Sequence, residues 1–129
     1  IDARRVAAES ARPRWEIFTH GGRRATGLDA IHYARQVVSL RAGEILLTSM
    51  NHDGTKQGFA LDITRQLAEN LPVPVIASGG GGLKEHFTDV FTKGKADAAL
   101  AASIFHFKEI SIPELKGYLH HQQIPVRTV

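Results

Sequence analysis

A serine followed by four glycines, residues 78–82, is the part of the sequence best suited by residue type to bind an anion. Glycine lacks a Cβ atom, so it can adopt positive φ and let backbone N–H groups approach a phosphate closely. The β-branched residues before this run, Val73, Val75 and Ile76, predict a strand, and the amphipathic pattern after it predicts a helix that ends at Gly94. We therefore expect a phosphate loop between a strand and a helix, with a flexible linker as the alternative.

A second candidate for anion binding follows the next apolar run. Residues 96–102 predict a strand of small side chains, and Ser103 is expected to cap a brief helix over 103–107. Barrels of eight strands and helices bind phosphate at the loops after their last two strands and at a short extra helix. Backbone N–H groups of Gly79, Gly80 and Ser103 are then the expected donors, together with the Ser103 hydroxyl. For Ser103, plain helix capping explains the residue equally well.

Two aspartates are candidates for acid or base chemistry. Asp2 directly follows an apolar residue, which predicts a position at the carboxyl tip of a strand that begins before Ile1. Asp53 follows the apolar run 44–49, so both carboxylates fall where barrel enzymes place their catalytic groups. Asp53-Gly54 is also a common turn pair, so a structural role for Asp53 stays open.

Other kinds of catalytic chemistry find no support in the residue pattern. The histidines His20, His52 and His106 show no metal-ligand spacing, and the sequence contains no cysteine. No serine has a glycine-flanked elbow. We expect neither a metal ion nor a cofactor, and the absence of cysteine agrees with a cytoplasmic location.

Strands and helices alternate through most of the chain. The patterns predict strands over 14–20, 44–49, 73–78 and 96–102, and helices over 29–40, 61–70, 83–93 and from 112 onward. The run 44–49 is almost continuously apolar, which predicts a strand covered on both faces. Such alternation requires a parallel sheet with right-handed crossovers. With Ile1-Asp2 counted, four strand tips are present, which is half of an eightfold barrel or a small open sheet.

Length and composition favour one globular unit spanning 1–129. Of the 129 residues, 43% are hydrophobic, and no segment has the roughly 20 consecutive apolar residues of a membrane-spanning helix. The net charge is +3, with a concentration of arginines near the start of the chain: Arg4, Arg5, Arg12, Arg14, Arg23 and Arg24. Without an aromatic array or a recognition helix, this favours a solvated segment and a small phosphorylated ligand over nucleic acid or a membrane surface. Because the chain opens at Ile1, its first residues are interpreted as an internal cut.

Several sequence blocks together resemble the cyclase subunit of imidazole glycerol phosphate synthase, an enzyme of histidine biosynthesis. The blocks that carry the resemblance are Ile1-Asp2-Ala3-Arg4-Arg5-Val6, Phe18-Thr19-His20-Gly21-Gly22, residues 43–49, Asp53-Gly54-Thr55-Lys56, residues 74–80 and residues 98–107. The resemblance implies a (βα)8 TIM barrel of two similar halves, with this chain as the C-terminal half. It also implies the reaction of ammonia with a phosphorylated ribulosyl aminoimidazole carboxamide intermediate, which gives imidazole glycerol phosphate and aminoimidazole carboxamide ribotide.

The resemblance also implies roles for individual residues. Asp2 matches the second of two catalytic aspartates, and the first belongs to the N-terminal half. Glu44 matches a gate residue at the opposite barrel mouth, where a glutaminase subunit docks and supplies ammonia. Asn51 stands where many members have aspartate. The phosphate site of the C-terminal half maps onto Gly54, Gly80, Ala102 and Ser103.

Two hypotheses of different class remain open. In the first, the chain is part of an enzyme and becomes active only with the N-terminal half. In the second, it is a stand-alone half-barrel that binds a phosphate ester and catalyses nothing. In either case we expect the isolated half to be catalytically silent and to self-associate through its open strand edges.

Overall fold

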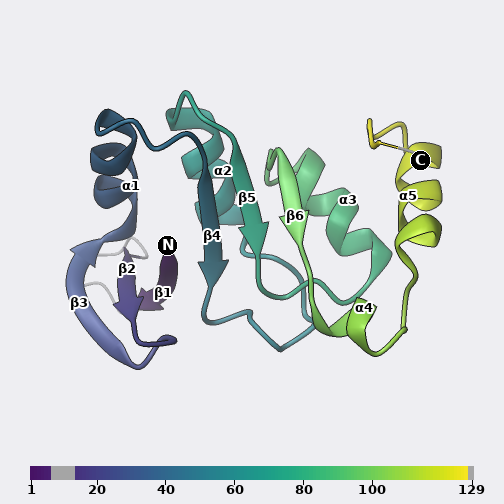
Figure 1. Ribbon diagram of the computed structural model, residues 1–129, viewed down its shortest axis with the longest axis horizontal. Coiled ribbons are helices and arrows are strands. Elements are labelled where there is room, and N and C mark those ends of the chain that lie inside the picture. Colours follow the sequence, from purple (N-terminus) through teal and green to yellow (C-terminus); the bar gives the residue numbers. More distant parts are fainter. Residues whose placement is uncertain (7–13, 128–129) are drawn as a thin grey trace.

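The computed structural model describes residues 1–6 and 14–127 of the chain, and in it a single sheet is flanked by helices (Figure 1). The described elements, in chain order, are β1 (Asp2–Val6), β2 (Arg14–Thr19), β3 (Arg24–Asp29), α1 (Ala30–Ser39), β4 (Ile45–Ser49), α2 (Leu61–Asn70), β5 (Val75–Ser78), α3 (Lys84–Thr92), β6 (Ala98–Leu100), α4 (Ser103–His106) and α5 (Ile112–His121). The predicted helices and the strands after residue 40 are all present, with ends that shift by a few residues.

The sheet is mostly parallel. Its strand order is β3-β2-β1-β4-β5-β6, and β1, β4, β5 and β6 run parallel to one another. In register, Leu46 of β4 lies beside Ile76 of β5, and Ile76 lies beside Ala98 of β6. The chain is thus an α/β protein of alternating strands and helices, an arrangement consistent with half of a (βα)8 barrel.

Two clusters of buried side chains hold the helices against the sheet, and β5 contributes to both. Val75 belongs to the first cluster, which α1 and α2 form with β1, β2 and β4; Ala77 belongs to the second, which α3, α4 and α5 form with the rest of the sheet. Burying one large aliphatic side chain contributes roughly 1.5–3 kcal/mol, so these clusters are the main source of stability. The largest fully buried members are Leu47, Ile63 and Leu67 in the first cluster and Ile104 and Val90 in the second.

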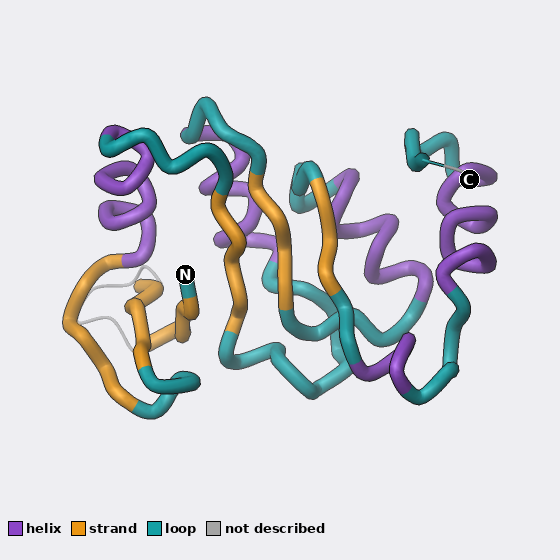
Figure 2. Tube along the Cα trace, viewed as in Figure 1, coloured by secondary structure: helices purple, strands orange, loops and turns teal. Residues whose placement is uncertain are grey.

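Within the described residues, helices cover only one face of the parallel part of the sheet (Figure 2). Along β4, Ile45 and Leu47 are buried, whereas Leu46 between them is 42% exposed. Leu100 at the end of β6 is 44% exposed. The prediction that residues 44–49 form a strand covered on both faces is therefore wrong for the described chain, because alternate side chains point to opposite faces and only one face has a helical layer.

Of the strands before α1, β2 confirms the strand predicted over 14–20, whereas β1 and β3 differ from the sequence expectation. Asp2 was expected to end a strand, but it begins β1, which continues to Val6 and pairs antiparallel with β2. Asp2 still lies level with Thr48, near the carboxyl end of β4. No strand was predicted before the helix expected from residue 29, but residues 24–29 form β3, in which the Thr26 hydroxyl donates to the Ile17 carbonyl, with an O···O distance of 2.7 Å.

Polar side chains cap the starts of two helices. The Asp29 carboxylate accepts from the His32 N–H at 2.8 Å, and the Ser111 hydroxyl accepts from the Glu114 N–H at 3.2 Å. Pro113, at an early helical position of α5, needs no N–H partner. Among residues 1–6 and 14–127, no helix is long and apolar enough to cross a membrane.

Candidate functional site

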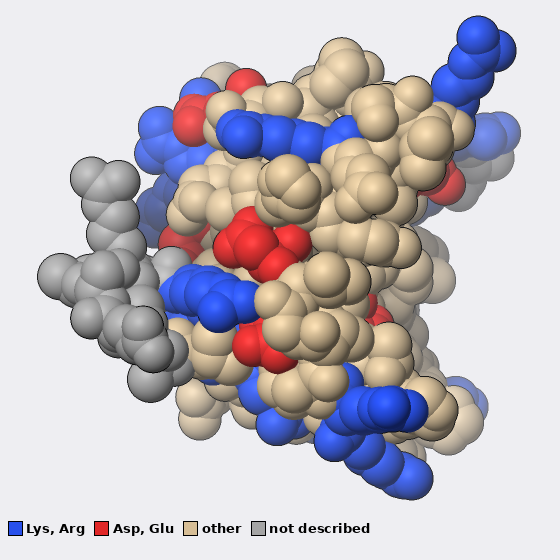
Figure 3. All heavy atoms as spheres, turned by 90° about the vertical axis from the view of Figure 1, so that its left-hand side faces the viewer, with Lys and Arg blue, Asp and Glu red and all other residues tan. Residues whose placement is uncertain are grey.

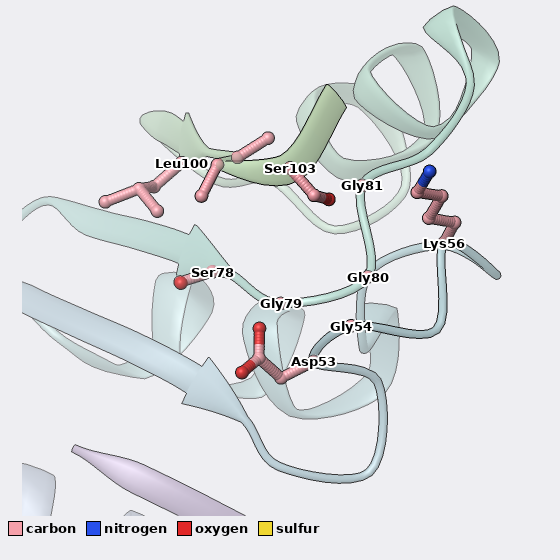
Figure 4. Close-up of a pocket in the computed structure, with 11 residues that line it drawn as sticks. Asp53, Gly54, Lys56, Ser78, Gly79, Gly80, Gly81, Leu100 and Ser103 are labelled. Atoms are coloured by element: carbon pink, nitrogen blue, oxygen red, sulfur yellow. The ribbon is translucent and has the colours of Figure 1, made fainter. Parts of the chain in front are cut away.

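Three loops at the carboxyl ends of β4, β5 and β6 enclose a cavity of about 150 Å³ (Figure 4). Because these strands are parallel neighbours, the loops that follow them meet at one edge of the sheet. The residues that line the cavity are Asp53, Gly54 and Lys56 after β4, Ser78 at the end of β5 with Gly79, Gly80 and Gly81 after it, and Leu100 at the end of β6 with Ala101, Ala102 and Ser103 after it. The structure thus brings together six of the eight residues singled out from the sequence, and their role in binding stays a prediction.

The close approach of two of these loops requires glycine at residue 80. Gly80 has φ +102°, and a Cβ atom there would lie 2.0 Å from the Gly58 carbonyl oxygen. In return the Gly58 N–H donates to the Gly80 carbonyl at 2.8 Å, so the two loops contact each other backbone to backbone. At Gly79, with φ +91°, a Cβ atom would lie 2.9 Å from the Ser49 carbonyl oxygen.

The next two glycines are packed equally tightly. A Cβ atom at Gly81 would lie 2.7 Å from the ring of Phe59, and one at Gly82 would lie 2.5 Å from the Lys56 carbonyl oxygen. All four glycines of the run are buried. A flexible linker does not describe this segment, because each glycine is packed where the neighbouring loop leaves no room for a side chain.

A histidine that the sequence analysis did not single out accepts hydrogen bonds from the end of the glycine run. His86, in the first turn of α3, accepts through Nδ1 from the N–H groups of Gly82 and Leu83, each at 3.2 Å. Backbone N–H groups are obligatory donors, so Nδ1 carries no proton in this arrangement and Nε2 is the protonated nitrogen. The start of α3 is therefore capped by a side chain three residues into the helix.

The third wall of the cavity is the start of α4. Ala102, not Ser103, is the N-cap residue, and its carbonyl accepts from the His106 N–H at 2.9 Å. Ser103 is the first helical residue, so the expectation that it caps this helix is wrong. Its hydroxyl points toward the glycine run (Figure 4), which leaves it available for a ligand in the cavity.

Charged side chains at the cavity are of both signs. Lys56 forms an ion pair with Glu109, which follows α4, and both side chains are about 40% exposed. The Asp53 carboxylate is exposed and points toward Gly79 (Figure 4). A carboxylate repels a phosphate, so an anion here would depend on backbone N–H groups and the Ser103 hydroxyl more than on a net positive charge.

The two remaining predicted site residues lie elsewhere. Asp2 is half-buried and lines a second, wider hollow of about 470 Å³ together with residues of β2, β3 and α1, such as Phe18 and Tyr33, and with His20 in the turn after β2. Glu44 is exposed directly before β4, at the opposite edge of the sheet from the cavity. The structure therefore separates the proposed acid or base from the proposed phosphate loops.

The arginines near the start of the chain are not gathered around one site. On the face shown in Figure 3, Lys and Arg side chains lie in separate groups with acidic side chains between them. The Arg4 guanidinium lies 4.8 Å from the centre of the Phe18 ring, and Arg14 donates to the Gly27 carbonyl at 2.6 Å. Both arginines stabilise the β1–β3 strands locally; Arg12 lies outside the described residues.

The carboxyl groups with a resolved pKa shift lie outside the cavity lining. A hydrogen bond from Lys95, then one from Arg65, holds the pKa of Glu69 below its usual 4.5. A hydrogen bond from Lys84, then the Ser111 backbone, likewise lowers the pKa of Glu114. These shifts report on surface ion pairs of the helical layer and not on the candidate site.

Sequence reasoning missed part of the site. Lys56 belongs to one of the motif blocks, but no feature of the sequence was a reason to assign it a role. It lines the cavity because of the turn that Gly54 allows, with φ +74°. Leu100 and Ala101 line the cavity simply because β6 ends earlier than expected. For His86, a polar residue four positions after the last buried glycine was the available signal.

The fold and the cavity together define an α/β protein of (βα) units with a glycine-lined pocket at the carboxyl edge of its sheet. Residues 1–111 match the family described as "Histidine biosynthesis protein". The chain belongs to this family, whose members are TIM-barrel enzymes of histidine biosynthesis and include isomerases and cyclases.

Proposed function

We propose that this chain is the C-terminal half of the cyclase subunit of imidazole glycerol phosphate synthase. The reaction joins ammonia to a phosphorylated ribulosyl aminoimidazole carboxamide intermediate and releases imidazole glycerol phosphate and aminoimidazole carboxamide ribotide. Support comes from the motif blocks that resemble the cyclase, from the family match over residues 1–111, and from the cavity. The cavity is the observation that carries the proposal, because it gathers six predicted residues from three separate loops.

In this proposal the cavity binds one phosphate of the substrate. Gly79, Gly80 and Ser103 supply N–H groups and a hydroxyl to the phosphate oxygens. Asp53 cannot attract the phosphate itself, but its carboxylate can accept hydrogen bonds from the hydroxyl groups on the carbon chain beside it. Gly54 and Ala102 complete the walls without side chains that would fill the space.

Asp2 is the proposed general acid or base. It lies at the carboxyl edge of the sheet, level with Thr48, in the hollow next to the cavity strands. A substrate held at one end by its phosphate would extend toward this hollow, so binding and proton transfer are assigned to different regions. No metal ion or cofactor enters the proposed reaction.

The proposed partners follow from the two edges and the uncovered face of the sheet. Glu44, at the edge opposite the cavity, is proposed to face a glutaminase subunit that supplies ammonia. The uncovered face, with Leu46 and Leu100 exposed, is proposed to be covered by the N-terminal half of the barrel or by a second copy of this chain.

Self-association of the 129-residue chain tests the second of these partners. We expect sedimentation at increasing concentration to show a dimer or larger species, and Leu46→Lys to shift it toward monomer because a charge then lies on the uncovered face. Leu40→Lys, at a side chain 74% exposed beyond α1, is the matched control and leaves association unchanged. A monomer at every concentration contradicts the proposed association with a second copy.

Activity assays distinguish the cyclase from its alternatives. The chain is combined with a second chain that carries four N-terminal (βα) units of a cyclase barrel, and ammonia and the substrate are added. Formation of imidazole glycerol phosphate supports the proposal. Isomerase activity without cyclase activity would assign the chain to the other branch of the family. Binding of a phosphate ester with neither activity would support the stand-alone binding module.

A further inference from the structure

His86 is bonded to the end of the loop after β5 and lies near the loop after β4, although it does not line the cavity itself. Its Nδ1 accepts from the N–H groups of Gly82 and Leu83, at the end of the glycine run. The loop after β4 passes near the other side of the ring, since a Cβ atom added at Gly58 would be 3.6 Å from the His86 Cδ2 atom. His86 therefore lies at the joint between the two loops.

The joint determines how the glycine run is presented to a ligand. Gly58 donates to the Gly80 carbonyl at 2.8 Å, which holds the middle of the run, and His86 holds its end through two N–H groups. Between these two points lies Gly81, which lines the cavity. Without the imidazole, the N–H groups of Gly82 and Leu83 lose their acceptor, and the buried end of the run has to rearrange.

We propose that His86 is a positioning residue for phosphate binding: its Nδ1, by accepting from the Gly82 and Leu83 N–H groups, holds the end of the glycine run in the shape that binds the anion. The inference rests on the proposed phosphate site. It assigns His86 no contact with substrate. The property that matters is an acceptor at the position of Nδ1, which an asparagine side chain can supply and a leucine side chain, with a methyl group in its place, cannot.

The experiment measures binding of inorganic phosphate by calorimetry, and thermal unfolding, for the unaltered chain and four variants. His86→Ala is expected to weaken phosphate binding about tenfold, since two loop N–H groups lose their acceptor. His86→Asn is expected to bind within about threefold of the unaltered chain, and His86→Leu as weakly as His86→Ala.

Ser111→Ala is the matched control, because it removes a helix cap of the same kind from α5, where the Ser111 hydroxyl accepts from the Glu114 N–H at 3.2 Å. This control is expected to lower stability without changing phosphate affinity, since Ser111 does not line the cavity. If His86 only stabilised the fold, His86→Ala would likewise lower stability without changing phosphate affinity.

The outcomes separate this inference from the proposed function. If the unaltered chain fails to bind phosphate, the proposed phosphate site is wrong. If it binds phosphate but His86→Ala binds equally well, or asparagine is no better than leucine, the positioning role is overturned and the phosphate site stands. Should His86→Ala fail to fold, the comparison of His86→Asn with His86→Leu still decides.

Discussion

The cavity after β4–β6 and the hollow beside β1–β3 are built in different ways. Backbone forms most of the cavity wall: glycines that neighbouring loops pack against, and the first turn of a short helix. Side chains form much of the hollow wall, including those of Asp2, Phe18 and Tyr33, which come from antiparallel strands and α1. Backbone donors suit the binding of an anion, whereas reactive side chains suit proton transfer. Substitutions in the two regions should therefore affect different steps.

The largest expected effect belongs to Asp2→Asn. A positioned acid or base typically contributes a factor of 10²–10⁴, so turnover in the reconstituted cyclase assay should fall by roughly that factor, about 3–5 kcal/mol in barrier height. Phosphate affinity should not change, because Asp2 lies outside the cavity lining. Asp89→Asn, at a surface pair with Lys93, is the control and should leave turnover intact. An effect confined to KM would assign Asp2 to binding and remove the contrast between the two regions.

Gly80→Ala is the corresponding test of the cavity. The new Cβ atom would meet the Gly58 carbonyl oxygen at 2.0 Å in a residue with φ +102°, so one loop must move. We expect a loss of about 3 kcal/mol in the free energy of unfolding, together with loss of phosphate binding. Gly117→Ala in α5, where nothing lies within 4 Å, is the control and should stabilise by about 0.5–1 kcal/mol. Unchanged phosphate affinity in Gly80→Ala would show that the glycine run does not bind the anion.

Ser103→Ala should have a smaller effect on the same cavity. It removes the hydroxyl that points toward the glycine run but keeps the backbone N–H of residue 103. Phosphate affinity should fall about ten- to a hundredfold, as expected for one hydrogen bond to a charged group, with turnover at saturating substrate nearly unchanged. Calorimetry and steady-state kinetics measure the two quantities. A loss of more than about a hundredfold would mean that a side chain, and not the backbone, dominates this cavity.

Glu69→Gln provides the smallest expected effect, away from both regions. Lys95 and Arg65 lower the pKa of Glu69 in the folded chain, so the carboxylate stabilises the fold above its unfolded pKa, and this stabilisation is lost as pH falls through the lowered folded value. The variant should be slightly less stable than the unaltered chain near neutral pH and equal to it in strong acid. Added salt should reduce the difference, because the pair is exposed. Chemical denaturation at several pH values checks this, and a difference that grows toward acid would contradict the assigned sign.

The same contrast explains how far the sequence could predict the structure. In the parallel region, hydrophobic periodicity and glycine positions locate α2 at Leu61–Asn70 and the strand before the glycine run, because each element's pattern matches its own packing. The six cavity residues could be predicted because parallel strands align their carboxyl ends at one edge. The resemblance to the cyclase reinforced the same residues.

The β1–β3 region was harder to predict, since its pairing depends on contacts distant in sequence. Arg4, Arg5 and Gly27 are not typical strand residues, and the strands become stable only when Ala3 packs in the core and Thr26 bonds to the Ile17 carbonyl. The roles of Lys56 and His86 depend on how two loops approach each other in three dimensions. Their type and spacing in the sequence do not reveal that approach.

The position of the cavity across the boundary between the two buried clusters has a mechanical consequence. The cavity residues that follow β4 extend from a strand whose Leu47 belongs to the first cluster. Ser103, on the opposite wall, begins the helix α4, whose Ile104 belongs to the second cluster. An anion bonded to both walls would connect two parts of the core that otherwise share mainly β5. Part of its binding free energy would then oppose local opening of either cluster, so occupancy of the cavity would raise the cooperativity with which the whole chain unfolds.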